Sequence, residues 1–112
     1  MPNSDQQISL SVQNGGYQYS GGNKGNGNVE NSVGQGPSKI HISLNAASNF
    51  FIKDVQFQGS GQENLSFNIN GNERRVTVDD NCQTPADVKY TVVVGDSNGG
   101  PDVLCDPRIV NK

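Results

Sequence analysis

The sequence predicts one all-β domain spanning residues 1–112, built as a two-sheet antiparallel β-sandwich of about 7–8 short strands. Three observations predict this fold class. Apolar residues recur at every second position in several short runs, which is the period of a strand with one buried and one wet face. Turn-forming asparagine and glycine separate the runs, and the chain contains 14 glycines. No segment has the 3.6-residue period of an amphipathic helix.

The predicted strands alternate Val, Ile, Leu, Phe or Tyr with small or polar residues. In chain order they are 8–12, 40–44, 50–57, 65–69, 74–78, 88–95 and 103–109. Hydrophobic residues make up only 31% of the chain, but they are concentrated in these runs. Because a sandwich core is only about 10 Å thick, these residues suffice to fill it.

The run 50–57 changes phase in its middle. Phe50 and Ile52 share one parity, whereas Val55 and Phe57 share the other. A β-bulge near residues 53–54 would place all four side chains on one face. A strand that crosses from one sheet to the other is the alternative.

Turn residues connect the predicted strands. Asn70-Gly71-Asn72 separates two alternating runs and predicts a hairpin. Residues 59–61 and 96–101 provide further connections. The segment 21–38 is rich in Gly and Asn with almost no apolar residues, which predicts a flexible surface loop.

Tyr90 lies early in the strongly apolar run 88–95. Immunoglobulin-like sandwiches place a tyrosine at this point, with its ring buried and its hydroxyl bonded to upstream backbone. We therefore expect an immunoglobulin-like sandwich in which Tyr90 has a structural role and pins a corner at 84–86. Pro107 cannot donate to a strand ladder, so it predicts an edge strand or a bulge near the end of the chain.

Oxygen-bearing side chains in the loop after residue 95 are the weak metal candidates. Asp96, Asn98 and Asp102 offer the oxygen ligands that calcium prefers. Calcium needs roughly 6–8 converging oxygens, and Asp and Asn in loops are explained first by turn formation. The Gly-rich segment also fails as a phosphate loop, because Lys24 precedes Gly25 and no helix follows. We expect no metal site and no cofactor.

The sequence does not predict an enzyme. His41 is the only histidine, and its place between two inward-facing isoleucines directs it to the outer face of a strand. No nucleophile elbow accompanies it, so a hydrolytic triad has no support. The carboxylates Asp79, Asp80, Asp96 and Asp102 could supply an acid–base pair, but nothing in the sequence places two of them at the required separation.

The net charge and the amino-terminal sequence limit the kinds of partner and the cellular location that we expect. The net charge is −3, which gives no basic footprint for nucleic acid or for an anionic membrane. The amino terminus has no signal-peptide pattern, so we expect a cytoplasmic protein unless a signal peptide has been removed. Cys82 and Cys105 are then reduced core residues, whereas in a secreted protein their pairing would be plausible.

The closing segment carries a resemblance to a known family. Asp106-Pro107, Ile109 and Asn111 match the Asp-Pro-x-Ile-x-Asn ending of small bacterial DP-EP proteins, and the chain more loosely resembles the inclusion-body proteins related to AidA and PixA. It departs from them at Cys105 and across the long Gly/Asn segment, and it lacks a Glu-Pro pair. The resemblance implies a cytoplasmic β-sandwich with no established activity, and it transfers no functional residues.

Two functional hypotheses follow. The first is a non-catalytic β-sandwich that acts by protein–protein interaction or self-association, as a homo-oligomer or with a protein partner, with 104–110 as the expected edge segment. The second is a ligand-binding module for carbohydrate or calcium that uses the loops at one end of the sandwich. Tyr17 and Tyr19 are the spare aromatics for a sugar platform, although they can equally cover one end of the core.

Overall fold

The computed structural model describes residues 3, 5–13, 16–22, 25, 27–105 and 108–111, and of residue 108 it describes the backbone only. These residues contain ten strands and one short 3-10 helix. In chain order the elements are β1 (Gln6–Gln13), β2 (Gly16–Gly21), β3 (Val29–Asn31), β4 (Ser38–Asn45), β5 (Phe50–Ser60), η1 (Gln62–Asn64), β6 (Leu65–Asn70), β7 (Arg75–Asp80), β8 (Ala86–Asp96), β9 (Val103–Cys105) and β10 (Arg108–Asn111).

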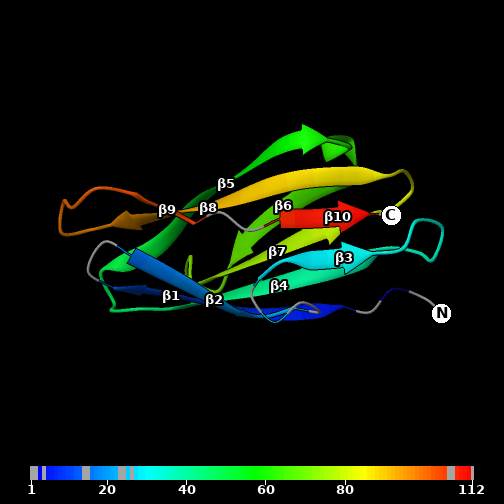
Figure 1. The fold of residues 1–112 in the computed structure, drawn as a ribbon. Helices are drawn as coiled ribbons and strands as arrows, with labels where there is room; N and C mark the ends of the chain where they lie inside the picture. The colour runs from blue at the N-terminus through cyan, green and yellow to red at the C-terminus, as the bar shows by residue number, and fades with distance from the viewer. Residues whose placement is uncertain are drawn as a thin grey trace.

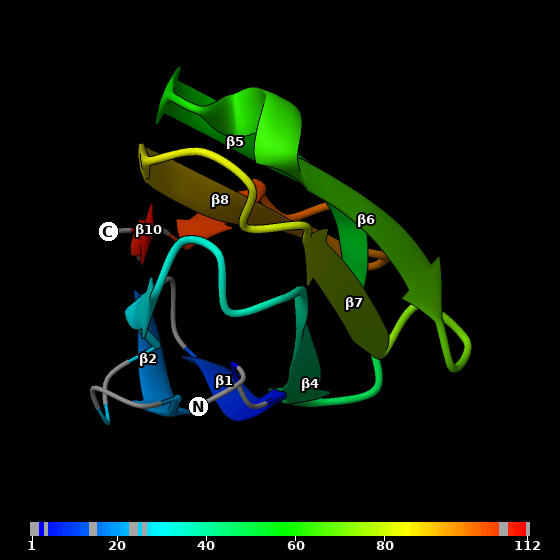
Figure 2. The ribbon, with the colours of Figure 1, turned by 90° about the vertical axis from the view of Figure 1, so that its right-hand side faces the viewer.

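The strands form two sheets that pack face to face (Figure 1). The first sheet has the order β2-β1-β4-β7-β6, and the second has the order β3-β10-β8-β5, with β9 pairing only with β8. Figure 2 shows the second sheet above the first, which curves upward from β2 to β6. The all-β class and the two-layer arrangement predicted from the sequence are confirmed.

The predicted antiparallel pairing is wrong at two places, and both sheets are mixed. β1 pairs in parallel with β4, and β3 pairs in parallel with β10. Sequence alternation cannot distinguish the two orientations, because it reports only which face is buried. Both parallel pairs join strands that are far apart in the chain, where a long connection allows either direction.

The core lies between the two sheets and contains the alternating residues of the predicted strands. Outside β6 and the ends of β5, their inward side chains are almost completely buried, among them Leu10, Ile40, Ile42, Val76, Val78, Val92 and Val94 at 0% exposure. Cys82 and Cys105 are buried free thiols.

The predicted bulge is confirmed in β5. Its register against β8 shifts between Ile52 and Asp54. The shift turns both halves of the strand toward the core: Ile52 and Val55 are buried, and Phe50 and Phe57 pack against the core.

The expectation of 7–8 strands was too low because the short strands carry little apolar alternation. β3 lies inside the segment 21–38 that we expected to be a loop, and its Val29 is part of the core. The expected closing strand 103–109 is divided into β9 and β10. Pro107 lies outside the described residues.

Tyr90 is buried and bonds to upstream backbone as expected, but at a different place from the corner at 84–86. The ring is fully buried, but the hydroxyl donates to the Gly27 carbonyl at 2.6 Å and not to the corner at 84–86. The corner is organised instead by Asn64, whose amide donates to Thr84 Oγ1 at 2.8 Å. Tyr90 therefore pins the Gly-rich segment to the core.

Candidate interaction surface

The ends of the two strand orders define the open edges of the sandwich. In the first sheet these are β2 and β6, and in the second they are β3 and β5. An edge strand exposes unpaired backbone N–H and C=O groups, which are templates for another strand. The expected edge at 104–110 is wrong for β10, because β10 lies between β3 and β8. It holds for β9, where Leu104 is 56% exposed.

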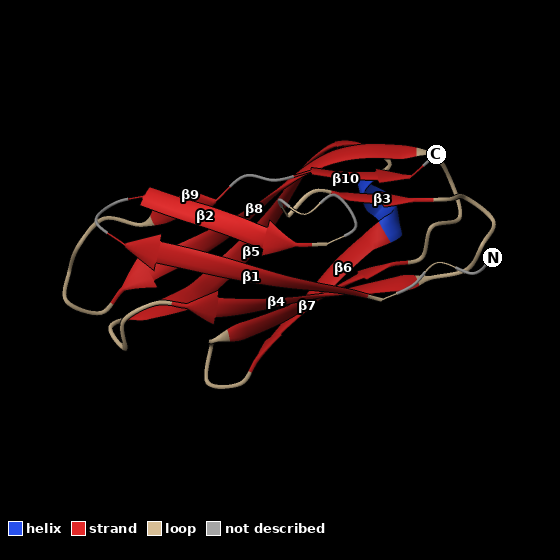
Figure 3. Cartoon of the chain, turned by 60° about the horizontal axis from the view of Figure 1, so that its bottom comes forward, coloured by secondary structure: helices blue, strands red, loops and turns tan. Residues whose placement is uncertain are grey.

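Four of these strands, β2, β3, β5 and β9, are protected. The Ile52 amide of β5 donates to Glu73 in a neighbouring turn at 2.7 Å, and the next two residues of β5 are charged and bulged. β3 and β9 are only three residues long. On the other side of the sandwich, the Tyr19 hydroxyl of β2 donates to the Cys105 carbonyl of β9 at 3.0 Å, and Figure 3 shows these two strands side by side.

β6 has none of these protections. Its sequence, Leu-Ser-Phe-Asn-Ile-Asn, contains no charged residue, no proline and no glycine. Among the described strands it pairs only with β7, and Figure 2 shows it at the rim of the sheet. A short uncharged strand of high β-propensity at an open edge is a site of strand addition.

The backbone atoms that face outward can be identified from the pairing with β7. The Asn81 amide donates to the Asn64 carbonyl at 2.9 Å, so these two residues form a hydrogen-bonded pair. Hydrogen-bonded and non-hydrogen-bonded pairs alternate along an antiparallel ladder. The N–H and C=O groups of Leu65, Phe67 and Ile69 therefore point away from β7, and the Leu65 N–H donates to the Gln62 carbonyl of η1.

The side chains of the same three residues form an apolar rim. Leu65 and Ile69 pack against the core, and Phe67 keeps 38% of its surface exposed. Phe67 meets Phe57 of β5 edge-to-face, with ring centroids 6.1 Å apart. The rim thus bridges the gap between the edges of the two sheets. We call the outward backbone and side chains of β6, together with Phe57, the β6 edge.

The β6 edge is held rigidly at both ends. At its start, Asn64 Oδ1 accepts hydrogen bonds from the Gln83 and Thr84 amides at 3.0 and 3.2 Å. At its end, the guanidinium of Arg74 donates to the carbonyls of Ala46 at 2.6 Å and Phe50 at 2.7 Å. A partner would therefore meet a preorganised strand, which lowers the entropic cost of pairing.

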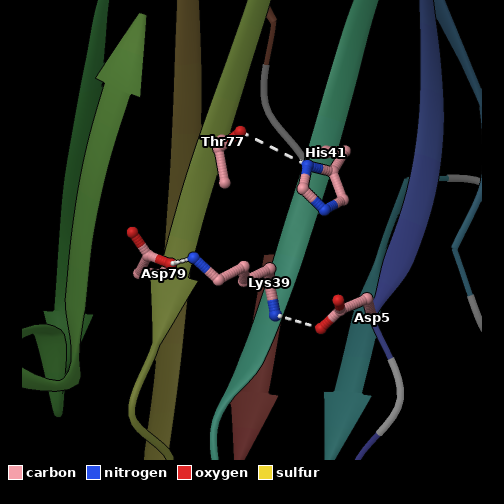
Figure 4. Close-up of polar contacts among 5 residues, drawn as sticks. All are labelled: Asp5, Lys39, His41, Thr77 and Asp79. Carbon is pink, nitrogen blue, oxygen red and sulfur yellow. Dashed lines mark hydrogen bonds and ion pairs between the residues drawn. The ribbon is translucent and has the colours of Figure 1, made fainter.

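The outer face of the first sheet beside β6 is polar (Figure 4). Lys39 and Asp79 form a cross-strand ion pair at 3.3 Å, with 59% and 47% of their side chains exposed. The Lys39 amide donates to Asp5 at 3.0 Å. Such an exposed pair contributes about 0–1 kcal/mol.

His41 lies on this outer face, as predicted. Its Nδ1 is 3.3 Å from Thr77 Oγ1, and the two residues are directly opposite each other on β4 and β7. Within the described part of the chain, no carboxylate hydrogen-bonds to the second ring nitrogen. The arrangement therefore lacks the orienting group that an activated nucleophile requires.

Two shallow hollows lie on the same face. One, of about 270 Å³, is lined by Asp5, Lys39, Glu63 and Asp79 beside the start of β6. The other, of about 300 Å³, is lined by His41, Thr77 and further polar residues. The first is lined by charges of both signs, and Arg75 is the one charged residue among those described that line the second. Neither lining favours one ligand class.

A buried carboxylate joins the two sheets behind this surface. Asp80, on β7 of the first sheet, is 0% exposed. It accepts hydrogen bonds from the side-chain amides of Asn31 and Asn111, each at 2.9 Å, and from the Cys82 amide at 3.0 Å. Asn31 and Asn111 belong to β3 and β10 of the second sheet. Asp80 therefore links the two sheets through hydrogen bonds, and we call this set of contacts the latch. The sequence did not predict it.

The latch also affects Cys82. Burial first, and the negative charge of Asp80 second, raise the pKa of the Cys82 thiol, although a hydrogen bond involving Asn3 opposes the shift. The Sγ atom lies 3.3 Å from the Ser32 carbonyl. A buried thiol with a raised pKa is a poor nucleophile.

The predicted metal candidates are engaged in separate local contacts. Asp96 Oδ1 accepts from the Asn49 side chain at 2.8 Å and from the Asn98 amide at 2.9 Å. Hydrogen bonds from Asn49 and Asn98 lower the pKa of Asp96. Asp102 pairs with Lys53 at 3.1 Å. The described residues contain no group of three or more His, Cys, Asp or Glu side chains that could hold a metal ion.

A cavity of about 420 Å³ opens at this end of the sandwich. Asp96 and Asp102 lie on its rim, and Val12, Phe50 and Val103 form its apolar wall.

The two spare tyrosines divide between core and surface. Tyr19 is 8% exposed and packs edge-to-face on Tyr90 at 6.2 Å. Tyr17 is 42% exposed and lies against Tyr19 at 5.8 Å. Only one of them could serve as an open aromatic platform.

Comparison with known proteins adds a fold relationship. No protein-family model and no curated protein matches the sequence. The chain is similar to the crystal structure of the inclusion body protein PixA from Burkholderia cenocepacia J2315, with a TM-score of 0.50 over 99% of this chain and 92% of that chain. The two proteins share a fold. Their sequences are 13% identical, so the likeness transfers the fold and nothing more. No described segment forms a helix long and apolar enough to span a membrane.

Proposed function

We propose that this chain is a non-catalytic structural protein that acts by self-association, and that the β6 edge is its contact surface. The observation that carries the proposal is an open, uncharged edge strand whose outward backbone groups belong to three apolar residues, Leu65, Phe67 and Ile69. Natural proteins usually block such an edge with charge, proline or a bulge. The neighbouring edge, β5, has two of these devices.

The solved structure that shares this fold is that of an inclusion body protein, and at 13% identity the likeness shows the fold alone. We propose a distant relation to the PixA-like and DP-EP proteins, and a sandwich of the immunoglobulin-like type. The closing motif has a physical role that fits this relation: Ile109 is fully buried, and Asn111 donates to Asp80.

Partner classes and location follow from charge and composition. The net charge of −3 favours another protein chain over nucleic acid or a membrane surface. We propose a homo-oligomer in the cytoplasm, where Cys82 and Cys105 stay reduced.

The test compares the oligomeric state of three proteins by light scattering after size exclusion. The wild type is expected to form dimers or larger species as its concentration rises. Phe67→Lys is expected to be monomeric, because it places a charge on the β6 edge. Tyr17→Lys is the matched control, since Tyr17 is an aromatic of similar exposure, 42% against 38%, on the opposite edge of the same sheet. A wild type that stays monomeric at high concentration would refute the proposal.

A second candidate function is ligand binding at the end cavity. The favouring observation is the 420 Å³ hollow with an apolar wall and two carboxylates, Asp96 and Asp102, on its rim. Thermal shift with calcium and with a panel of glycans tests it. A rise in Tm that Asp96→Asn abolishes would support binding there, and no shift with any ligand would reject it.

A further inference from the structure

We infer that two copies of the chain pair antiparallel through β6 about a two-fold axis, with Phe67 of one copy opposite Phe67 of the other. The inference rests on the proposed self-association and specifies its register. It follows from three properties of the β6 edge: which backbone groups are unpaired, which side chains flank them, and where the charges lie.

The outward backbone groups of β6 limit which residues of the two copies can lie opposite one another. Leu65, Phe67 and Ile69 are the residues whose N–H and C=O groups point outward, so each of them must face one of the same three residues in the second copy. When Phe67 faces Phe67, Leu65 faces Ile69 and Ile69 faces Leu65. The Leu65 N–H already donates to the Gln62 carbonyl, so this register forms four hydrogen bonds, from the two Phe67 and the two Ile69 amides. A slip that places Phe67 opposite Leu65 keeps only two of them. A slip that places Phe67 opposite Ile69 keeps four, but it separates the two Phe67 rings and leaves Leu65 opposite Gly71.

The side chains are self-complementary in this register. On the inner face the stripe of Leu65, Phe67 and Ile69 continues into its own copy, so each exposed Phe67 ring is covered by the other. On the outer face, Ser66 lies opposite Asn68 of the second copy. Cross-strand pairs of matched polarity stabilise a sheet, and aromatic pairs contribute most.

No like charges come face to face. β6 is uncharged, and the outer-face charges of β7 next to it are Asp79, which lies opposite Ser66, and Arg75, which lies opposite Asn70. In the two-fold register Asn68 of the second copy lies opposite Ser66. Thr77 of the second copy lies next to that Asn68, because Asn68 pairs with Thr77 within each copy. The two Asp79 side chains therefore lie in different rows of the joined sheet.

The expected dimer is weak. A strand of six residues is about 20 Å long, and a single edge-to-edge ladder buries much less than the ~1,200 Å² total of stable specific complexes. Association should depend on concentration, and a covalent trap is the suitable way to read its register.

Disulfide trapping distinguishes the registers. In the inferred register Ser66 and Asn68 form a non-hydrogen-bonded pair, with Cα atoms about 4.5 Å apart, which suits a disulfide. Identical positions are diagonal neighbours at about 7–8 Å, which is too far. Mixing Ser66→Cys with Asn68→Cys under mild oxidation should therefore give a covalent heterodimer in large excess over either homodimer. A cleavable tag on one variant separates the species on a non-reducing gel.

The controls use features of the same chain. Ser66 and Asn68 are exposed on the outer face, so both variants should fold like the wild type by circular dichroism. Cys82 and Cys105 are buried, so the oxidised wild type should give no covalent dimer.

Each other outcome has a distinct meaning. Homodimers of Ser66→Cys alone, or of Asn68→Cys alone, would show a strand slipped by two residues, which overturns the register but keeps self-association through β6. Self-association by light scattering without any of these cross-links would also overturn the register. A wild type that is monomeric by light scattering would overturn the proposed function as well.

Discussion

Replacing Asp80 by alanine tests the interpretation of the latch between the sheets. The substitution removes the acceptor for three buried donors: the side-chain amides of Asn31 and Asn111 and the backbone amide of Cys82. Each buried donor left without a partner costs about 1–3 kcal/mol. Removing a buried charge recovers part of this loss, so we expect the lower end of the range, about 3 kcal/mol in total.

Asp79→Ala is the matched control, because it alters the adjacent residue on the other face of β7. Asp79 forms only the exposed pair with Lys39, so its loss should cost about 0–1 kcal/mol. Urea unfolding measures both. With m near 1.5 kcal/mol/M, the midpoint of Asp80→Ala should fall by about 2 M. Asp80→Asn, which keeps one acceptor oxygen, should lie between Asp80→Ala and the wild type. Equal midpoints for Asp79→Ala and Asp80→Ala would refute the latch.

Three further predictions concern local contacts. Tyr90→Phe should lower the free energy of unfolding by about 1–3 kcal/mol, measured by urea unfolding, because it leaves the buried Gly27 carbonyl without its donor. Gly25→Ala and Gly27→Ala both place alanine at positive φ, which costs about 1–2 kcal/mol. Only at Gly27 would the new Cβ also lie 2.6 Å from the Tyr19 side chain. Gly27→Ala should therefore have the clearly lower Tm. Carboxyl NMR should show the pKa of Asp96 below its ordinary value and, in Asn49→Ala, shifted back upward. Since the folded pKa is depressed, the stability contributed by Asp96 is present above its unfolded pKa and is lost as pH falls through the folded pKa. An unchanged Asp96 pKa in Asn49→Ala would contradict this cause.

Much of the fold could be predicted because local signals determine it. The alternation in β1, β4 and β7 reports which side chains are buried, and the phase change in β5 reports the bulge. The hairpin between β6 and β7 was predicted from Asn70-Gly71-Asn72, although Asn70 belongs to β6 and the connection is the four-residue turn 71–74. These features depend on neighbours in the chain, where a sequence pattern is informative.

The remaining features depend on contacts between distant residues. The parallel pairing of β1 with β4 and of β3 with β10 has no local signature, and β3 is too short to show a period. The hydrogen bonds that Asp80 accepts from Asn31 and Asn111 join residues 49 and 31 positions apart in the sequence, so no local pattern predicts them.

The same distinction between local and long-range features applies to the β6 edge. The sequence predicts a strand at 65–69, but its place at an edge follows from the strand order, which alternation does not encode. The absence of charge and proline in β6 was the available signal. It becomes informative only once the edge is known.

A charge exchange at Phe67 tests self-association through β6 most directly. Phe67→Lys and Phe67→Glu each place like charges opposite one another at the two-fold axis, so each variant alone should be monomeric by sedimentation equilibrium. An equimolar mixture places Lys opposite Glu and should form a heterodimer that weakens as salt is added. A mixture that stays monomeric while the wild type self-associates, or single variants that associate as strongly as the wild type, would contradict the account.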